Sequence, residues 1–384
     1  MTATTSTRIA AAPRIPVYDV GPDARDLEAV AEVLRSGWLT MGPRTERLED
    51  ELASRLGCRH AVAVSSGTAA LHLACVAAGI GAGDEVIVPS QTFVATANAV
   101  AYCGGTPVFA DVVGPRDLGV DPDDVEARVG TRTRAVIAVH YAGYPAAVDR
   151  LAELCAERGL ALIEDVAHGP GGMLHRRSLG AFGIAGCFSF FATKILPAGE
   201  GGALVTDSDE VAEWARLLRS HGMTATTMDR HLGRAMTYDV TARGFNYRLD
   251  ELRSALLCSR LAGLEANLER RRELVRRYRR LLASEQGLLL PWEDNDVARS
   301  SCYMMPVLVD PARRAAVRRK LREVHGVQTA VYPAAHELRL YRDRAGSLPR
   351  TERVARSMLA LPLFAHLSWE EQDRVVAALG EALR

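Results

Sequence analysis

The sequence contains almost no lysine. Lys194 and Lys320 are its two lysines, and arginine supplies the rest of the 47 basic side chains among the 384 residues. An arginine guanidinium stays protonated, whereas the amine of a desolvated lysine has a lowered pKa and can act as a nucleophile. Any chemistry that needs an amine therefore depends on one of these two positions. From composition alone, a surface lysine that escaped the arginine bias is the simpler interpretation.

Other absences narrow the class of protein. The formal net charge is zero, which removes the electrostatic argument for a nucleic-acid partner or a membrane surface. No apolar run is long enough to span a bilayer, and residues 1–13 lack the apolar core of a signal peptide. The seven cysteines form no CxxC pair, so neither a metal site nor a disulfide framework is expected. These absences favour a cytoplasmic protein.

The length and the hydrophobic content of 48% predict two domains with sizeable cores. We expect a tail at 1–15, a large domain at 16–250, a long connecting helix at 251–286 and a small C-terminal domain at 287–384. The small domain is expected to contain strands at 303–309 and 327–331, a helix at 312–324, and helices after Pro349 and Ser368.

Strands and helices alternate through the first half of the chain. Short apolar runs are separated by helical patterns at 68–78, 94–102 and 147–158, and the runs lie at 61–64, 85–88, 107–109, 135–139 and 160–163. This alternation predicts an α/β fold in which helices cover both faces of a mainly parallel central sheet. Ligands of such sheets bind beyond the carboxyl ends of the strands.

Chemically distinctive residues follow these predicted strands. Ser66, Gly67 and Thr68 open a helix, and a helix N-terminus with hydroxyl groups suits a phosphate, although a plain N-cap would have the same sequence. Phe93, at a strand-to-helix turn, either belongs to the core or presents its face to a planar ring. Asp165 ends an apolar strand, where a carboxylate can pair with a pyridinium nitrogen rather than with an arginine.

Lys194 lies in the most distinctive run of the sequence. The alternating apolar residues at 188–191 indicate a short strand, and Pro197 and Gly199 indicate a tight turn into another strand at 203–206. Lys194 is therefore expected at a shielded strand end. There its amine is a candidate covalent anchor for an aldehyde cofactor.

Three aromatic residues are candidates for a substrate pocket. Trp38 lies in a loop between two predicted helices and either fills a crevice or lines a pocket near its entrance. Tyr332 and His336 follow a predicted strand of the small domain, and they either face the cofactor or pack internally.

Two long polar stretches have simpler interpretations. Residues 221–241 show little periodicity and are expected to form a loop that covers a pocket. A long helix is expected from Leu249 onward, and its arginine-rich part at 270–280 keeps an apolar stripe. We therefore expect those arginines to form a solvated helix face rather than a nucleic-acid site.

Taken in order along nearly the whole chain, these motifs resemble the DegT/DnrJ/EryC1/StrS family of pyridoxal-phosphate sugar aminotransferases. The resemblance implies the fold of the aspartate aminotransferases, which is fold type I of the pyridoxal-phosphate enzymes. The matching stretches are 37–40, 66–71, 92–96, 164–165, 188–190, Lys194, 199–202 and 244–248.

The resemblance also implies a role for each site residue. Lys194 would form the Schiff base with pyridoxal 5′-phosphate, and Asp165 would keep its ring nitrogen protonated. Phe93 would cover one ring face, and the phosphate would contact Gly67, Thr68 and Ser189. His168, which is often Gln in relatives, would lie near the phenolate oxygen. Asn246, in the 244–248 motif, would reach the phosphate of the neighbouring subunit, so that a homodimer shares its active sites. From spacing alone, Asn246 could instead cap the helix that starts near Leu249 in its own chain.

The expected activity is transfer of an amino group from an amino acid, with glutamate expected by resemblance, to a keto sugar or keto-cyclitol. Nucleotide-linked keto-deoxyhexoses are among the substrates that the resemblance implies, in amino-sugar or antibiotic biosynthesis. A sugar dehydratase is an alternative, but the dehydratase relatives replace the lysine with histidine. A non-catalytic regulatory protein is another, but it would need a DNA-binding module.

Overall fold

The structure is a computed structural model, and it describes residues 15–21, 23–343 and 346–384. The predicted tail lies outside the described residues except for Ile15. This residue is fully buried, and its N–H donates to the carbonyl of Gly326 at 3.1 Å. Ile15 therefore packs with the C-terminal part of the chain. The division into four regions stays a prediction.

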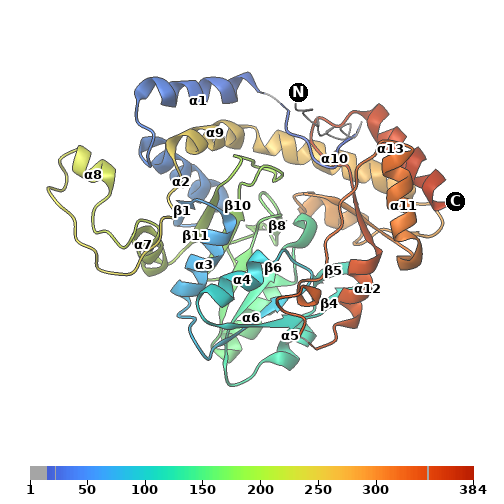
Figure 1. The fold of residues 1–384 in the computed structure, drawn as a ribbon, viewed down its shortest axis with the longest axis horizontal. Helices are drawn as coiled ribbons and strands as arrows, with labels where there is room; N and C mark the ends of the chain where they lie inside the picture. The colour runs from blue at the N-terminus through green and yellow to red at the C-terminus, as the bar shows by residue number, and fades with distance from the viewer. Residues whose placement is uncertain (1–14, 22, 344–345) are drawn as a thin grey trace, which may run out of the picture.

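The predicted α/β fold with a mainly parallel sheet is confirmed (Figure 1). Seven strands form the central sheet in the order β1-β11-β10-β7-β6-β2-β3. Only β11 runs antiparallel to its neighbours. The strands are β1 (His60–Val64), β2 (Glu85–Pro89), β3 (Thr106–Ala110), β6 (Thr133–Val139), β7 (Ala161–Asp165), β10 (Ala185–Ser189) and β11 (Gly202–Thr206).

Helices cover both faces of this sheet because its strands are apolar on both sides. In β1, Val62 and Val64 pack into one hydrophobic cluster, while Ala61 and Ala63 pack into another. The first cluster includes α3 (Gly67–Ala77), α4 (Ala95–Tyr102) and α7 (Asp209–Leu218). The second includes α2 (Pro43–Leu56), α6 (Val148–Arg158) and α9 (Glu251–Ala262). The remaining elements of this part are α1 (Ala24–Ser36), α5 (Pro122–Arg128) and the hairpins β4 (Val112–Gly114)–β5 (Asp117–Val120) and β8 (Met173–Leu174)–β9 (Arg177–Ser178).

A second, antiparallel sheet lies in the C-terminal part. Its strands are β12 (Leu288–Leu289), β13 (Met305–Val309) and β14 (Met358–Leu361), next to α11 (Pro311–Glu323), α12 (Pro349–Ser357) and α13 (Trp369–Leu383). The predicted strand at 327–331 is wrong. The chain makes only single-residue bridges there, Val327 with Ile15 and Ala330 with Ala360, while β14 takes the place beside β13.

The predicted long helix is two helices, α9 and α10 (Leu264–Leu282), which meet at Gly263. Glycine has no side chain to pack and the largest backbone entropy, so a helix is weakest at such a residue. The two helices run along one edge of the molecule above the central sheet (Figure 1).

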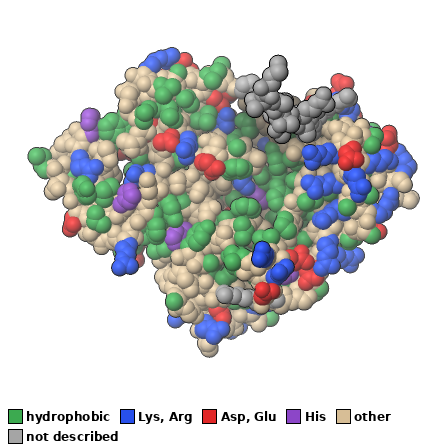
Figure 2. Space-filling model, in the orientation of Figure 1, with side chains coloured by type: hydrophobic (Ala, Val, Ile, Leu, Met, Phe, Trp, Pro, Cys, Tyr) green, Lys and Arg blue, Asp and Glu red, His purple; other side chains and the backbone are tan. Residues whose placement is uncertain are grey.

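The arginines of α10 do not form the solvated face that we expected. Arg271 is buried, with 5% of its surface exposed. Arg272 is half-buried and donates to the carbonyls of Ser300 at 3.0 Å and Gly171 at 3.2 Å. A helix face that packs on loops meets carbonyl groups, and guanidinium donors satisfy them. Exposed basic side chains gather instead over α11 and α13, at the right of Figure 2.

The polar stretch at 221–241 contains a short helix, α8 (Thr227–His231), and extends away from the central sheet (Figure 1). None of its residues lines the cavity described below, so it does not cover the pocket of its own chain as expected. Apolar side chains are exposed along it, and Met236 is 95% exposed.

Among the described residues, no helix has the length and apolar character that crossing a membrane requires.

Candidate active site

A cavity of about 490 Å³ opens at the carboxyl ends of the parallel strands. It contains the ends of β6, β7 and β10, which the parallel register brings to one edge of the sheet. Residues from the C-terminal part close the other side. The lining residues used below are Tyr18, Gly67, Thr68, Phe93, Asp165, His168, Ser189, Lys194, Tyr303 and Tyr332.

Lys194 follows β10 in the connection to β11. The two strands pair antiparallel, and the connection is held by backbone bonds such as Phe190 N–H to the Gly201 carbonyl at 2.8 Å. The predicted turn and the strand after it are confirmed, whereas the strand before Lys194 is Ala185–Ser189 rather than 188–191, so Lys194 lies in the turn and not at the strand end. The Lys194 amine lies 4.7 Å from the centre of the Tyr303 ring, so it points at the cavity wall rather than into solvent.

Asp165 ends β7 and is 6% exposed. Its Oδ2 accepts a hydrogen bond from the Thr96 hydroxyl at 2.8 Å, and its Oδ1 accepts one from Ala167 N–H at 3.1 Å. Burial raises the pKa of this carboxyl, although the two hydrogen bonds and the charge of Lys194 oppose the shift. A cation placed beside Asp165 would relieve the cost of its buried negative charge.

The preceding residue, Glu164, has a different environment. It is fully buried and accepts hydrogen bonds from the N–H groups of Gly180, Phe182 and Gly183. His140 Nε2 lies 3.0 Å from its Oε2. Both carboxylate oxygens of Glu164 therefore already accept hydrogen bonds, and Glu164 does not line the cavity. Its role is to bind the backbone N–H groups of the 180–183 loop.

His168 is buried in the cavity wall. Its ring stacks on Tyr303 with a centre-to-centre distance of 4.1 Å and an angle of 15°. Burial, with the charge of Lys194, lowers the pKa of His168 well below its usual value, so the ring is neutral at physiological pH. Its Nδ1 is buried and has no hydrogen-bond partner among the described residues. This nitrogen is available to a polar group in the cavity.

The N-terminus of α3 forms one end of the cavity. Ser66 caps the helix, since its Oγ accepts from Ala69 N–H at 3.0 Å. The preceding N–H groups, of Gly67 and Thr68, have no acceptor within the helix and suit an anion. A side chain at Gly67 would place its Cβ 2.8 Å from the Cβ of Ser189. Glycine is therefore required for the close approach of helix and strand.

Aromatic residues form the remaining walls. Phe93 lines the cavity and is 64% exposed in the single chain, so its ring is not part of the core. On the other side, the hydroxyls of Tyr18 and Tyr332 are hydrogen-bonded to each other, and Tyr18 stacks on Tyr303 at 5.7 Å. Burial and the neighbouring phenols raise the pKa of Tyr18, so it remains a hydrogen-bond donor.

The sequence analysis did not identify Tyr18, Thr96 or Tyr303 as site residues. Tyr18 and Tyr303 come from segments far from the sheet in sequence, and no local pattern distinguishes them. Thr96 had a signal, because it lies in the 92–96 stretch that resembles the family; in the structure its hydroxyl is 2.7 Å from that of Thr92.

Three predicted site residues lie outside this cavity of their own chain. Trp38 lies against His231, with ring centres 4.7 Å apart and the ring planes tilted by 47°. His336 is buried, and its Nδ1 lies 2.6 Å from the Ser90 hydroxyl, which makes it a packed histidine. Asn246 is exposed. It does not cap α9 either, since the cap is Asp250.

The family model of the DegT/DnrJ/EryC1/StrS aminotransferases matches residues 22–380. The chain belongs to this family. It is an aminotransferase of fold type I, and its cofactor is pyridoxal 5′-phosphate. The recognition, the fold, the enzyme class and the cofactor predicted from sequence are thus confirmed.

Three solved structures illustrate the similarity. The aminotransferase TlmJ from Streptoalloteichus hindustanus is 38% identical with a TM-score of 0.90, and the match covers 96% of this chain and 98% of that chain. DesI, solved in the presence of its TDP-sugar product, is 35% identical with a TM-score of 0.86, covering 96% and 93%. NtdA from Bacillus subtilis, with bound cofactor PMP, is 29% identical with a TM-score of 0.84, covering 97% and 86%.

The residues of the cavity fit this cofactor. A buried acid with a raised pKa, a neutral histidine with an unpartnered nitrogen and a helix N-terminus surround a space that contains a lysine. These groups match a protonated ring nitrogen, a ring oxygen, a phosphate and an aldehyde, respectively.

Proposed function

We propose that this aminotransferase moves an amino group from an amino acid, with glutamate as the expected donor, to a keto sugar. A nucleotide-linked keto-deoxyhexose is the expected acceptor, and a keto-cyclitol is the alternative. The observation that carries the proposal is the cavity in which Lys194 and Asp165 lie together. The family membership and the similarity to DesI with its TDP-sugar product support the acceptor class. A cytoplasmic location stays a prediction from the sequence.

When bound, pyridoxal phosphate supplies an aldehyde that joins to amines and a ring that accepts electrons from the substrate carbon. Lys194 would hold the aldehyde through its Nζ, and the same nitrogen would carry a proton during the transfer. Asp165 keeps the ring nitrogen protonated, because the buried carboxylate is most stable beside a cation.

The other residues position the cofactor and exclude water. His168 offers its free Nδ1 to the ring oxygen, and Phe93 covers a ring face. The N–H groups of Gly67 and Thr68 and the hydroxyls of Thr68 and Ser189 hold the phosphate. The dehydratase alternative has no supporting observation, since Lys194 occupies the place where those relatives are expected to have histidine.

Half-reactions test the proposed function. Mixed with glutamate alone, the enzyme should lose the absorbance of the lysine-bound cofactor and release 2-oxoglutarate. Amino sugars, linked to a nucleotide or free, should produce the same spectral change, because they run the second half-reaction in reverse. The best substrate is identified by its affinity. If no amino acid or amino sugar changes the spectrum, the proposed transfer is wrong.

The active site is proposed to be shared in a homodimer, with Asn246 reaching the phosphate of the partner's cofactor. Asn246 is exposed and lies outside the cavity of its own chain. The nearby 221–241 segment exposes apolar side chains, including Met236, as an interface would require. An amide can donate to a phosphate oxygen without adding charge to the site.

Mixing two inactive variants tests the shared site. Lys194→Ala and Asn246→Glu should each be inactive as homodimers. Heterodimers of the two should recover activity, because one of their two sites keeps both residues intact. Subunit exchange is verified by native mass spectrometry. Heterodimers without activity would show that Asn246 acts within its own chain.

A further inference from the structure

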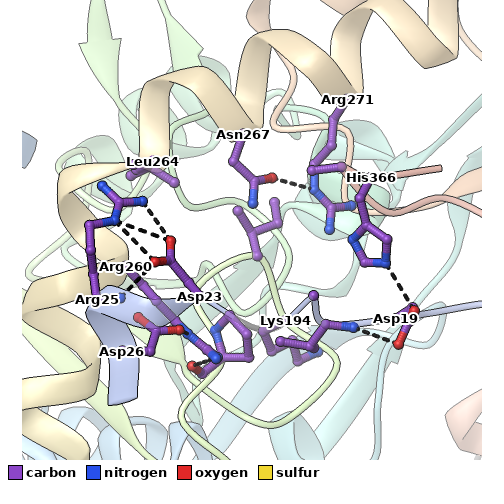
Figure 3. A pocket seen from close by; sticks show the side chains of 16 residues that line it. Asp19, Asp23, Arg25, Asp26, Lys194, Arg260, Leu264, Asn267, Arg271 and His366 are labelled. Atoms are coloured by element: carbon purple, nitrogen blue, oxygen red, sulfur yellow. Dashed lines mark hydrogen bonds and ion pairs between the residues drawn. The ribbon is translucent and has the colours of Figure 1, made fainter. Parts of the chain in front are cut away.

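A second cavity, of about 330 Å³, shares Lys194 with the cofactor cavity (Figure 3). Its walls come from the start of the described chain, from the loop after Lys194, from the junction of α9 and α10, and from residues 365–366. A group bound there would lie next to the lysine that the proposed reaction uses. The residue roles discussed so far leave this cavity without a ligand.

Most of the charged side chains in this second cavity are paired. Figure 3 shows the pairs, and they are Arg25 with Asp23 at 2.6 Å, Arg260 with Asp26 at 2.7 Å, and His366 with Asp19 at 2.9 Å. Each aspartate therefore already has a basic partner. These pairs leave little capacity for a ligand that carries several charges.

Arg271 differs from the other arginines of the cavity. It is 5% exposed, and among the described residues it makes no ion pair with a carboxylate. Its Nε donates to Asn267 Oδ1 at 2.8 Å, and its Nη1 contacts the carbonyls of Tyr303 at 3.4 Å and Leu363 at 3.3 Å. Burial lowers its pKa to about 10, so it stays protonated at neutral pH. A buried cation without a counter-ion is costly, and an anionic ligand would remove that cost.

We infer that Arg271 binds a carboxylate of the amino-acid donor. This inference rests on the proposed function. The planar guanidinium matches a carboxylate, to which it can donate two hydrogen bonds. Because Asp19, Asp23 and Asp26 already occupy the other basic side chains of the second cavity, a diphosphate would bring more negative charge than Arg271 can balance. Among the described residues of the second cavity, Arg271 is the arginine without a carboxylate partner, and a monoanionic group beside Lys194 would balance its charge.

Replacing Arg271 tests the inference, with its neighbour as the control. Arg271→Met should raise KM for glutamate about 10- to 100-fold, the size expected for a lost charge-assisted hydrogen bond, with KM for the keto substrate unchanged. Arg272→Met removes a guanidinium from the same helix that bonds loop carbonyls but does not line the second cavity. This control should leave KM for glutamate unchanged.

A binding measurement gives a readout that does not depend on turnover. Glutarate, a dicarboxylate without an amine, should bind the cofactor-loaded enzyme in calorimetry, and Arg271→Met should weaken it by the same factor. If that variant does not fold, Asn267→Asp keeps the inference testable. It places a carboxylate beside Arg271 with almost no change in shape, and the internal counter-ion should weaken glutarate binding.

The outcomes separate the inference from the proposed function. If glutamate converts the wild-type cofactor but the Arg271 and Asn267 variants bind glutarate normally, the inference is overturned and the proposed function stands. If Arg271→Met instead weakens a nucleoside diphosphate and leaves glutarate unaffected, the second cavity binds the sugar substrate, and the inference is again overturned. If the wild type converts no amino acid, the proposed function is wrong, and the inference that rests on it is wrong as well.

Discussion

The two cavities that meet at Lys194 are lined by different kinds of side chain. The cofactor cavity is lined by aromatic rings, small residues and strand ends, and Asp165 is its deeply buried charge. The second cavity is lined by ion pairs that the N-terminal segment makes within itself, with α9 and with His366, and by Arg271 of α10. The first suits a flat ring with one protonated nitrogen, whereas the second suits a small anion. A transaminase needs both environments, since the ring must be stabilised and the donor must be oriented.

The same contrast appears within one strand. Glu164 and Asp165 end β7 side by side, and both are buried. Glu164 is surrounded by three backbone donors, whereas Asp165 accepts two hydrogen bonds and faces the cavity. A fully satisfied carboxylate stabilises the fold, and a partly satisfied one is available for chemistry.

The largest effect is expected from removing the group that both cavities share. Lys194→Ala should abolish the absorbance of the lysine-bound cofactor and lower turnover by at least about 10⁴-fold, because the proton-transferring amine is lost. Lys320→Ala is the matched control, since Lys320 is exposed and donates to the Glu381 carbonyl. An unchanged spectrum in Lys194→Ala would remove this residue from the chemistry.

A smaller effect separates the two acids of β7. Asp165→Asn should lower turnover roughly 10²- to 10³-fold, as for the loss of one electrostatic stabiliser, while the cofactor still binds. Glu164→Gln should instead lower the melting temperature and leave the turnover of the folded enzyme nearly unchanged. Equal losses of turnover in the two variants would contradict the distinction between them.

The raised pKa of Asp165 also predicts a pH dependence. Because the folded-state pKa exceeds the unfolded value, the protonated carboxyl contributes stability at low pH that is lost as pH rises through the folded pKa. Without cofactor, Asp165→Asn should therefore melt at a higher temperature than the wild type at pH 7. This difference should disappear near pH 3. A difference that does not vary with pH would show that Asp165 is not the titrating group.

The smallest effect concerns the phosphate end of the cofactor cavity. Gly67→Ala would bring a Cβ within 2.8 Å of the Ser189 Cβ, and the overpacking should weaken cofactor binding about tenfold. Gly81→Ala is the control, because its Cβ would meet no atom closer than 4.0 Å. Titration of each apoenzyme with pyridoxal phosphate, followed by absorbance, measures the cofactor affinity of the two variants. Equal cofactor affinity in the two variants would show that α3 and β10 can move apart to accommodate the methyl group without weakening cofactor binding.

Local patterns predicted the central sheet and most of the residues at its strand ends. A strand buried on both faces is a short continuous apolar run, and a helix that packs on the sheet has a 3.6-residue apolar period, so both can be recognised locally. The opposite wall was not predictable, because Tyr18 and Tyr303 reach the cavity through packing between distant segments. Arg271 was interpreted as solvated for a similar reason, since a charge run does not reveal which of its members faces a loop. Gly263 is a local signal for the end of a helix, but the apolar residues continue at helical spacing on both sides of it and so predicted one uninterrupted helix.

The measurement that tests the central claim most directly is chemical reduction of the enzyme with its cofactor. Borohydride converts the bond between a lysine amine and the cofactor aldehyde into a stable amine, and trypsin does not cleave after the modified lysine. Mass spectrometry should then find the pyridoxyl group on the uncleaved peptide 178–216, which contains Lys194 as its one lysine. A pyridoxyl group on Lys320, or cleavage after Lys194 in an enzyme that retains its cofactor, would contradict the account.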